Sequence, residues 1–238
     1  MNRPTPAERA AAVRRTEEAA SRRRNLYVVA AVAAVLALVV TIGVLVQGRR
    51  DTTGAAVDTV PSGVTAEHGV VVGEEDAERT VVIYEDFQCP ACGLLESATS
   101  EAVRQGVADG TVKVEYRIVS FLDRASANAY SSRAANAALA VHEVAGADAF
   151  AAFHDALFAA QPEEGTAGPT NDELIEQAVK AGAGRAEVTP LIEDGTFDAW
   201  VVAATDAMSK AGVRSTPTAI IDGTPAADPT AELLAAVQ

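Results

Sequence analysis

The stretch TVVIYEDFQCPAC, residues 80–92, runs from a predicted strand into the start of a predicted helix. Residues 80–87 carry apolar side chains on both faces, which is typical of a buried, central parallel strand. Pro90 suits the first position of a helix, and apolar side chains recur at helical spacing over residues 90–109. Residues 112–121 alternate apolar and polar side chains, as a strand with one solvated face does. The order strand, helix, strand predicts a right-handed βαβ unit.

Cys89 and Cys92, the two cysteines of the chain, fall where this strand meets the helix. A thiolate at a helix N-terminus faces the positive end of the helix dipole and free N–H groups, which lower the pKa of the thiol. We therefore expect Cys89, at the more exposed N-cap position, to be the attacking thiol. Cys92 lies one turn later and can close a disulfide with it. The chemistry would need no cofactor beyond this redox-active disulfide.

Other uses of a cysteine pair fit the sequence less well. A structural disulfide usually joins distant segments, because a two-residue gap removes little chain entropy. Zinc needs about four ligands, and His68, His142 and His154 are isolated, so we expect no metal site. Haem attachment needs a histidine after the second cysteine, where this chain has Gly93. His154 lies beside a phenylalanine stripe, and we interpret it as a partly buried structural histidine rather than a catalyst.

Charge is distributed unevenly along the 238 residues, which are 49% hydrophobic and carry a net charge of −14. Residues 1–50 hold nine arginines and three acidic residues, a net charge of +6. Residues 51–238 hold ten basic and thirty acidic residues, a net charge of −20. So acidic a globular part repels nucleic acid phosphates, and nucleic acid is excluded as a partner.

Residues 26–46 form an uncharged run of 21 residues that is long enough to cross a lipid bilayer. The alternative is a cleaved signal peptide, but its apolar part is usually shorter and ends in small residues, whereas this run is followed by Gln47-Gly48-Arg49-Arg50. We expect an uncleaved, single-pass anchor in the cell membrane. The arginine-rich tail, residues 1–25, would lie in the cytoplasm and the rest outside. Residues 47–67 read as a flexible linker.

The remaining sequence completes an α/β domain over residues 68–238. A short strand is predicted over 69–73, and a helical block fills about residues 125–212, with a capping box at Thr170-x-x-Glu173. A strand at 218–221, a turn and a last helix that begins at Asp228-Pro229 follow. Helices are thus inserted into one connection of an α/β sheet, downstream of one transmembrane helix.

Three segments together resemble a known family. Residues 84–92, YEDFQCPAC, are similar to the active-site segment of the DsbA-like family of thioredoxin-fold disulfide oxidoreductases. Residues 213–218, VRSTPT, resemble the cis-proline loop of that family. Residues 121–124 and 132–135 are similar to membrane-anchored members of actinobacterial type. The likeness covers about residues 68–238 and implies a thioredoxin fold with an inserted helical block.

The resemblance implies roles for residues around the cysteine pair. Cys89 would attack, Cys92 would resolve, and a cis bond before Pro217 would place Thr216 beside them for contact with the substrate backbone. Pro90 and Ala91 would help to shape this site. The partners would be exported polypeptides that contain cysteine, with a quinone-linked membrane protein as reoxidant.

Two positions depart from the family pattern. Members often carry a buried acid six residues before the first cysteine, where this chain has Ile83. Glu85, on the same strand face, is the candidate proton relay in its place, and an ordinary solvated acid is the alternative. The Pro90-Ala91 dipeptide supplies no histidine to stabilise the thiolate, so the helix terminus would be the main stabiliser.

Three functions are compatible with these residues. The first is an extracytoplasmic oxidase that donates the Cys89–Cys92 disulfide to exported proteins, which its location favours. The second is a reductase or isomerase that uses the same pair. The third is a non-enzymatic thioredoxin-like binding module, against which the presence of both cysteines argues.

Overall fold

The computed structural model describes residues 57 and 59–237, and its elements follow the predicted order. They are β1 (Val70–Val72), β2 (Arg79–Glu85), α2 (Pro90–Ala108), β3 (Val112–Ile118), α3 (Tyr130–Ala159), α4 (Asn171–Lys180), α5 (Arg185–Glu193), α6 (Asp198–Lys210), β4 (Thr218–Ile221), β5 (Thr224–Pro225) and α7 (Pro229–Ala236). The expected tail, anchor and first part of the linker, residues 1–56, lie outside the described residues. Among the residues described, no helix combines the length and apolar character needed to cross a membrane.

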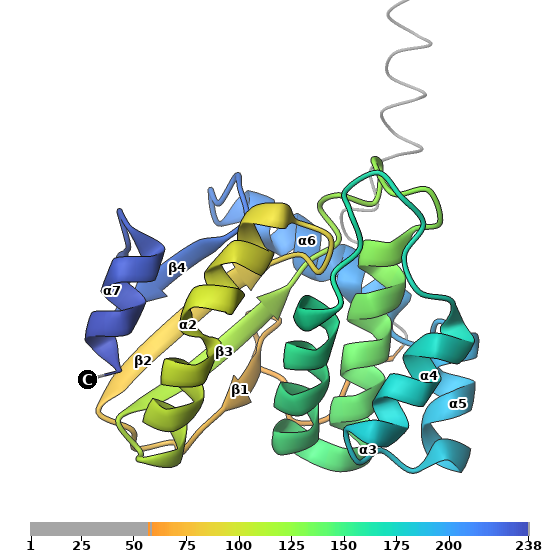
Figure 1. Ribbon diagram of the computed structural model, residues 1–238, viewed down its shortest axis with the longest axis horizontal. Coiled ribbons are helices and arrows are strands. Elements are labelled where there is room, and N and C mark those ends of the chain that lie inside the picture. Colours follow the sequence, from red (N-terminus) through yellow and green to blue (C-terminus); the bar gives the residue numbers. More distant parts are fainter. Residues whose placement is uncertain (1–56, 58, 238) are drawn as a thin grey trace, which may run out of the picture. The chain divides into compact units, whose positions relative to one another are not determined.

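The five strands form one sheet in the order β1-β3-β2-β4-β5 (Figure 1). β2 runs parallel to β3, with Val81 opposite Val114, and antiparallel to β4, with Ile83 opposite Ala219. Val81 and Ile83 are buried, which confirms the prediction of a buried central strand with a parallel neighbour. The C-terminal end of β2, which leads into the cysteine pair, therefore lies in the middle of the sheet.

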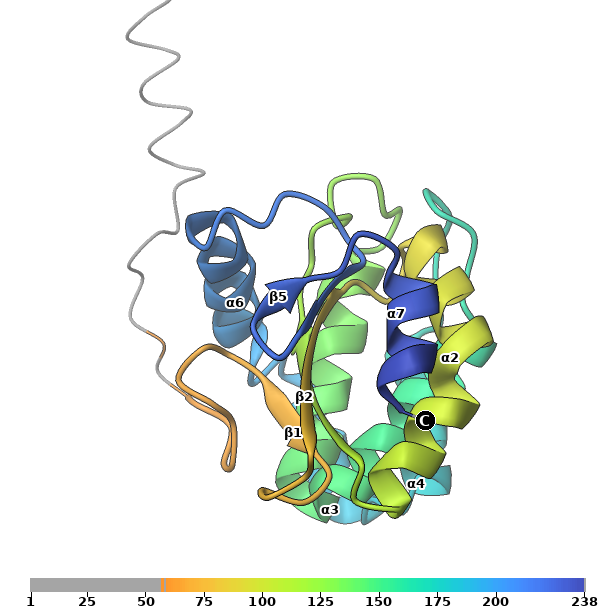
Figure 2. The ribbon, with the colours of Figure 1, turned by 90° about the vertical axis from the view of Figure 1, so that its left-hand side faces the viewer.

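Helices cover both faces of this sheet. Figure 2 shows α2 and α7 on one face and α6 on the other. α2 begins where predicted, with Cys89 as N-cap and Pro90 in the first turn. The predicted capping box of α4 is present at Thr170 and Glu173, and the Asp228 side chain caps α7 through the N–H of Ala231.

The chain inserts α3, α4, α5 and α6 between β3 and β4, which confirms a thioredoxin fold with a helical insertion. Two details differ from the expected continuous helicity over residues 125–212. α3 breaks at Gly146, where φ is 82°, a value that glycine adopts without the strain a side chain would cause. His142 and Phe150, on either side of the break, make a ring contact, so the two parts of α3 pack together. Residues 160–170 are not helical and reach the active-site turn.

The last part of the expected linker packs on the domain. Val64 forms a β-bridge with Val70, the Thr65 hydroxyl donates to Glu115, and the backbone N–H of Ser62 donates to Glu143. These contacts span up to 81 residues of sequence. The domain therefore begins before residue 68, its predicted start, because polar residues of the expected linker find partners on β3 and α3.

Candidate active site

Cys89 is the N-cap of α2 and follows the short turn that connects β2 to this helix. Its side chain is 7% exposed, whereas that of Cys92, one turn into the helix, is fully buried, so the more accessible thiol is the predicted one. Both cysteines are free thiols in this structure. Cys89 has extended backbone angles and no side-chain cap bond, which leaves the N–H groups of the first turn of α2 free to face its sulfur.

The surroundings of Cys89 favour the thiolate. A hydrogen bond from the Cys92 thiol contributes most, followed by Thr216 and by the backbone N–H groups of Cys92 and Ala91. Although burial acts in the opposite direction, these bonds lower the pKa of Cys89 to about 5. The stabilisation thus comes from the helix terminus and from Cys92, in keeping with a dipeptide that contains no histidine.

The surroundings of Cys92, in contrast, favour the protonated thiol. Its hydrogen bond to Cys89, its burial and the negative charge of Glu85 raise its pKa well above that of an ordinary thiol. At neutral pH the reduced pair therefore holds a thiolate at Cys89, the more accessible sulfur, and a fully buried thiol at Cys92, a difference that suits an attacking and a resolving cysteine.

The loop that precedes β4 meets this pair. The Thr216–Pro217 bond is cis, as the resemblance implies, and the Cys89 Sγ lies 3.4 Å from the carbonyl oxygen of Thr216. Thr216 and Pro217 are half-buried, and Pro90 and Ala91 are exposed beside Cys89. Residues 127 positions apart in sequence thus line one surface around a single sulfur atom.

Asp86, which sequence reasoning missed, holds the turn before the cysteines. It is fully buried and accepts hydrogen bonds from the N–H of Gln88, the N–H of Leu122 and the hydroxyl of Ser131. Burial raises the pKa of Asp86 to about 6, against the effect of these bonds. One carboxylate therefore joins the active-site turn to the loop after β3 and to the first turn of α3.

The loop of residues 160–170 holds the same turn from the other side. The Gln161 amide donates to the carbonyl oxygens of Phe87 and Cys89, at 3.1 and 2.9 Å. The buried Gln88 amide donates in return to two carbonyls of that loop, those of Glu163 and Thr166. No local signal in the sequence identifies these glutamines, because their partners lie more than 70 residues away.

The position of the Gln161 side chain also explains why residue 93 is a glycine. A Cβ at this position would lie against Oε1 of Gln161, closer than non-bonded atoms approach. Glycine therefore follows the second cysteine because the Gln161 side chain occupies the space beside it.

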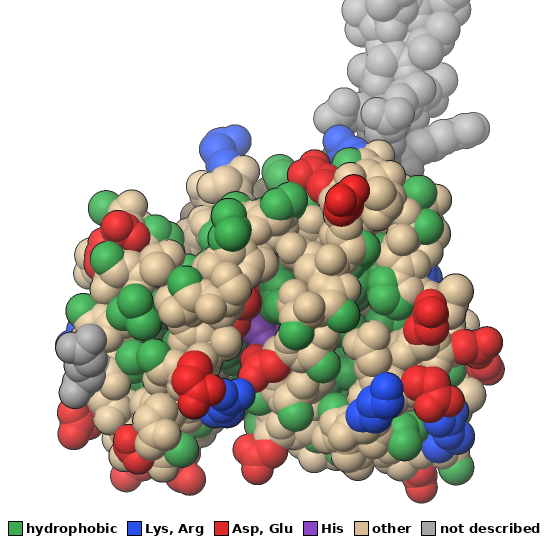
Figure 3. All heavy atoms as spheres, viewed as in Figure 1, with side chains coloured by type: hydrophobic (Ala, Val, Ile, Leu, Met, Phe, Trp, Pro, Cys, Tyr) green, Lys and Arg blue, Asp and Glu red, His purple; other side chains and the backbone are tan. Residues whose placement is uncertain are grey.

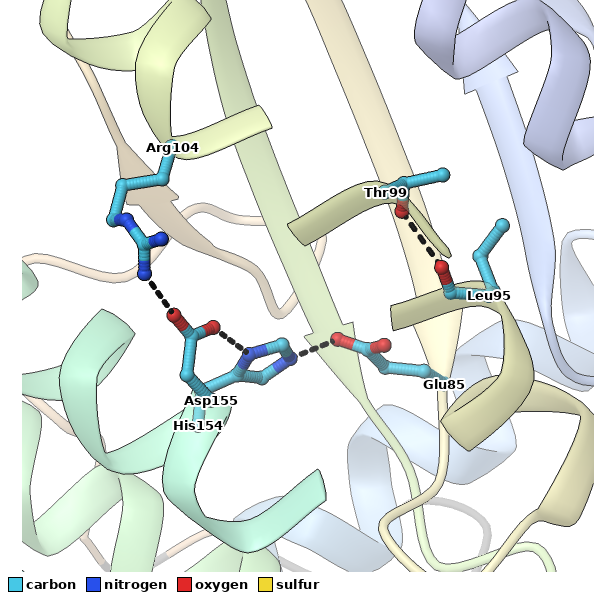
Figure 4. Close-up of polar contacts among 6 residues, drawn as sticks. All are labelled: Glu85, Leu95, Thr99, Arg104, His154 and Asp155. Atoms are coloured by element: carbon cyan, nitrogen blue, oxygen red, sulfur yellow. Dashed lines mark hydrogen bonds and ion pairs between the residues drawn. The ribbon is translucent and has the colours of Figure 1, made fainter. Parts of the chain in front are cut away.

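Glu85 lies beneath the cysteines and is fully buried, so the alternative of a solvated acid is wrong. Both faces of β2 are covered at this end, and the Glu85 Oε1 lies 2.6 Å from Nε2 of His154 in α3 (Figure 4). His154 is completely rather than partly buried. Burial acts to lower the pKa of His154, but Glu85, Asp155 and Glu96 together outweigh it and raise that pKa to about 10.

The polar contacts continue from His154 towards the surface. Figure 4 shows His154 Nδ1 facing Asp155, whose other oxygen faces Arg104, each at 3.4 Å. Glu96, on α2, lies close to the same pair and is nearly buried. Burial and the charge of Glu85 raise the pKa of Glu96. The histidine thus has a carboxylate on each ring nitrogen, an arrangement that isolated histidines in the sequence do not reveal.

The arrangement around the two sulfurs suits thiol–disulfide exchange. It provides an accessible nucleophilic thiolate, a buried second thiol within hydrogen-bond reach and a backbone surface for an extended peptide. Fold and site together define a thioredoxin-fold protein with a redox-active Cys-x-x-Cys pair.

Comparison with known proteins supports the same class of protein. The profile of the thioredoxin family matches residues 65–237. The reduced disulfide bond oxidoreductase DsbG of Mycobacterium tuberculosis superposes with a TM-score of 0.65 at 34% identity, over 73% of this chain and 88% of that one. Reduced DsbA of the same organism superposes with a TM-score of 0.61 at 30% identity, over 72% of this chain and all of that one. The chain belongs to the DsbA-like family of thioredoxin-fold thiol:disulfide oxidoreductases, and it is an enzyme of that class.

A partial match to a larger protein accompanies these. The serine/threonine-protein kinase PknE of M. tuberculosis is 34% identical over 119 residues, which make up 48% of this chain and 21% of the kinase. The chain therefore spans about a fifth of the length of the curated relatives it matches.

Proposed function

We propose that this protein is a membrane-anchored oxidase that donates the Cys89–Cys92 disulfide to exported polypeptides. The observation that carries the proposal is the position of the Cys89 sulfur, at the start of α2 among several hydrogen-bond donors, above a fully buried Cys92. These donors stabilise the thiolate that exists only when the disulfide is open. Stabilising the reduced form makes a dithiol pair a stronger oxidant.

In the proposed reaction, a substrate thiolate attacks the Cys89 sulfur, the bond to Cys92 breaks, and Cys92 leaves and takes up a proton. A second substrate thiolate then attacks the substrate sulfur of the mixed disulfide, and Cys89 leaves as a thiolate. The substrate loses two electrons and the cysteine pair gains them. Glu85 is the candidate proton relay, since its charge acts on Cys92.

The substrate would bind as an added strand. Backbone groups beside Thr216 and Pro217 are half-buried next to the Cys89 sulfur, and Pro90 and Ala91 border it on the other side. An extended peptide that pairs with this loop through backbone hydrogen bonds brings its cysteine to Cys89, and its other side chains need not be recognised. This mode of contact suits an enzyme with many substrates.

Location and recycling complete the proposal. The uncharged run of residues 26–46 would anchor the chain in the cell membrane, with residues 1–25 in the cytoplasm and the catalytic domain outside. After each cycle the pair needs an oxidant, and a quinone-linked membrane protein is the proposed one. Full-length protein in the membrane fraction, with its domain open to external protease, is the expected result, and a soluble mature form would contradict it.

The direct test is the reduction potential of the full chain in detergent, measured against glutathione. We expect a value above that of thioredoxin, about −270 mV, and below that of the strongest oxidants, about −120 mV. Cys92→Ala should accumulate mixed disulfides between Cys89 and exported proteins, and Cys89→Ala is the matched control that should accumulate none. A potential at or below that of thioredoxin, without such adducts, would favour the reductase.

A further inference from the structure

Glu85, Glu96 and His154 form a compact cluster that the exchange reaction does not use as a whole. They come from β2, α2 and α3, and one ligand atom of each lies within 4.8 Å of the others. Their exposed fractions are 0%, 5% and 0%. In the sequence the histidines are isolated and predict no metal site, but the fold brings two carboxylates to His154.

One carboxylate oxygen of this cluster has no partner. Glu85 Oε1 faces His154, whereas its Oε2 is buried and makes no hydrogen bond. A buried polar atom without a partner costs free energy, and native structures contain few of them. A cation bound between the two carboxylates would satisfy this oxygen and offset the repulsion between their charges.

His154 is oriented as a metal ligand is. Its Nε2 faces the cluster, and its Nδ1 lies 3.4 Å from Oδ1 of Asp155 on the far side of the ring. Metal-binding histidines almost always place a carboxylate or another acceptor behind the second ring nitrogen, which fixes the ring and the tautomer. Arg104 in turn faces the other oxygen of Asp155.

A hollow reaches Glu96, at the edge of the cluster. This hollow of about 190 Å³ lies between α2 and the end of α3, with Glu96 and Asp155 in its lining. Figure 3 shows acidic side chains and a histidine in a hollow on this face of the molecule. The hollow can admit an ion and can hold a water molecule as a fourth ligand.

We propose that Glu85, Glu96 and His154 bind a zinc ion, with water from the hollow as the fourth ligand. One nitrogen and two carboxylate oxygens around an open position are a ligand set that zinc accepts, whereas calcium and magnesium prefer oxygen alone. Ligand atoms on a tetrahedral zinc ion lie about 3.3 Å apart, so Glu85 and His154 must separate slightly from 2.6 Å. Binding displaces protons from the cluster.

The test uses the oxidised full chain in detergent, in which both thiols are tied up in the disulfide. Calorimetric titration with zinc chloride should give one site per chain, and calcium chloride should give none. Glu96→Gln should weaken zinc binding at least tenfold, and Asp155→Asn should weaken it roughly tenfold to a hundredfold by loosening His154. Glu101→Gln is the matched control, because this exposed acid of the same helix should leave zinc binding unchanged.

Circular dichroism of each variant separates lost binding from lost folding. Absence of zinc binding to the oxidised chain, or binding that appears only after reduction, would overturn the proposal, since the thiols would then be the ligands. Binding of equal strength in folded Glu96→Gln and in Glu101→Gln would overturn it as well.

Discussion

The side-chain amide of Gln161 lies 2.9 Å from the backbone carbonyl oxygen of Cys89, to which it donates a hydrogen bond across 72 residues of sequence. The same amide donates to Phe87. The helical insertion therefore does more than extend the fold, because its loop of residues 160–170 fixes the backbone that carries Cys89, the proposed attacking thiol.

Replacement of Gln161 by alanine should loosen this turn. Both carbonyls lose the Gln161 amide; that of Cys89 keeps the N–H of Gly93, whereas the loss at Phe87 leaves an unmet hydrogen bond, which at a partly buried site costs about 1–3 kcal/mol. We expect a lower free energy of unfolding in urea and a higher midpoint pH for alkylation of Cys89. Gln105→Ala is the control, since the Gln105 amide binds only the exposed Asp109 side chain and its loss should change neither quantity.

The loss of stability caused by Gly93→Ala should depend on which residue occupies position 161. In the parent chain the added methyl group collides with Gln161, which its own hydrogen bonds hold in place, so we expect a clear loss of stability. In a Gln161→Ala background the space is free, and the same change should cost little. Urea unfolding of the two single variants and of the double variant measures this coupling. Additive changes in the free energy of unfolding would contradict the assigned role of the glycine.

Asp86→Asn should destabilise the domain. An amide cannot accept three hydrogen bonds as the carboxylate does, and its NH2 group would face a backbone N–H group of Gln88 or Leu122. We expect a loss of about 1–3 kcal/mol in the free energy of unfolding. Ser131→Ala, which removes one of the three bonds and leaves the carboxylate, should cost less. Equal losses would mean that the charge of Asp86 is unimportant.

The stability of the reduced protein should depend on pH through Cys89. The pKa of about 5 in the folded state is below the value of about 8.5 in an unfolded chain. The thiolate therefore contributes stability that is fully present above about pH 8.5 and is lost as the pH falls through 5, by up to about 1.4 kcal/mol per pH unit. The oxidised protein has no such group.

Denaturation of both redox forms should accordingly show a reduced form that is the more stable at neutral pH, with a difference that shrinks towards pH 5. Alkylation of Cys89 should rise with pH around 5. A difference that does not change with pH, or an oxidised form that is clearly more stable, would count against the oxidase. Cys89→Ser has no thiolate at this position, so its stability should vary with pH as that of the oxidised parent does, through the other titratable groups such as Asp86.

Signals carried by neighbouring residues predicted the local structure correctly. Pro90, the capping box at Thr170 and Asp228 each mark a helix start through contacts within three residues, so the sequence is enough to place them. The cysteine pair likewise lies at the predicted strand–helix junction and marks the candidate active site, since its chemistry depends on the start of one helix.

Relationships across the fold could not be predicted in this way. His154 follows Phe150 and precedes Phe158 at helical spacing, which indicates burial, but its partner Glu85 lies 69 residues away on another element. Glu85 itself reads as a solvated acid as easily as a buried one, because nothing local states that both faces of β2 are covered. Asp86 and Gln161 were missed for the same reason.

Because β2 lies between β3 and β4 in the sheet, its two edges are paired at different times during synthesis. β3 follows β2 closely, whereas β4, its other neighbour, comes only after all four inserted helices. Until residues 218–221 leave the ribosome, one side of β2 offers unpaired N–H and C=O groups to any other strand. The nascent chain therefore carries an open sheet edge while the four inserted helices are made, a period in which a chaperone that covers this edge would raise the yield of folded enzyme.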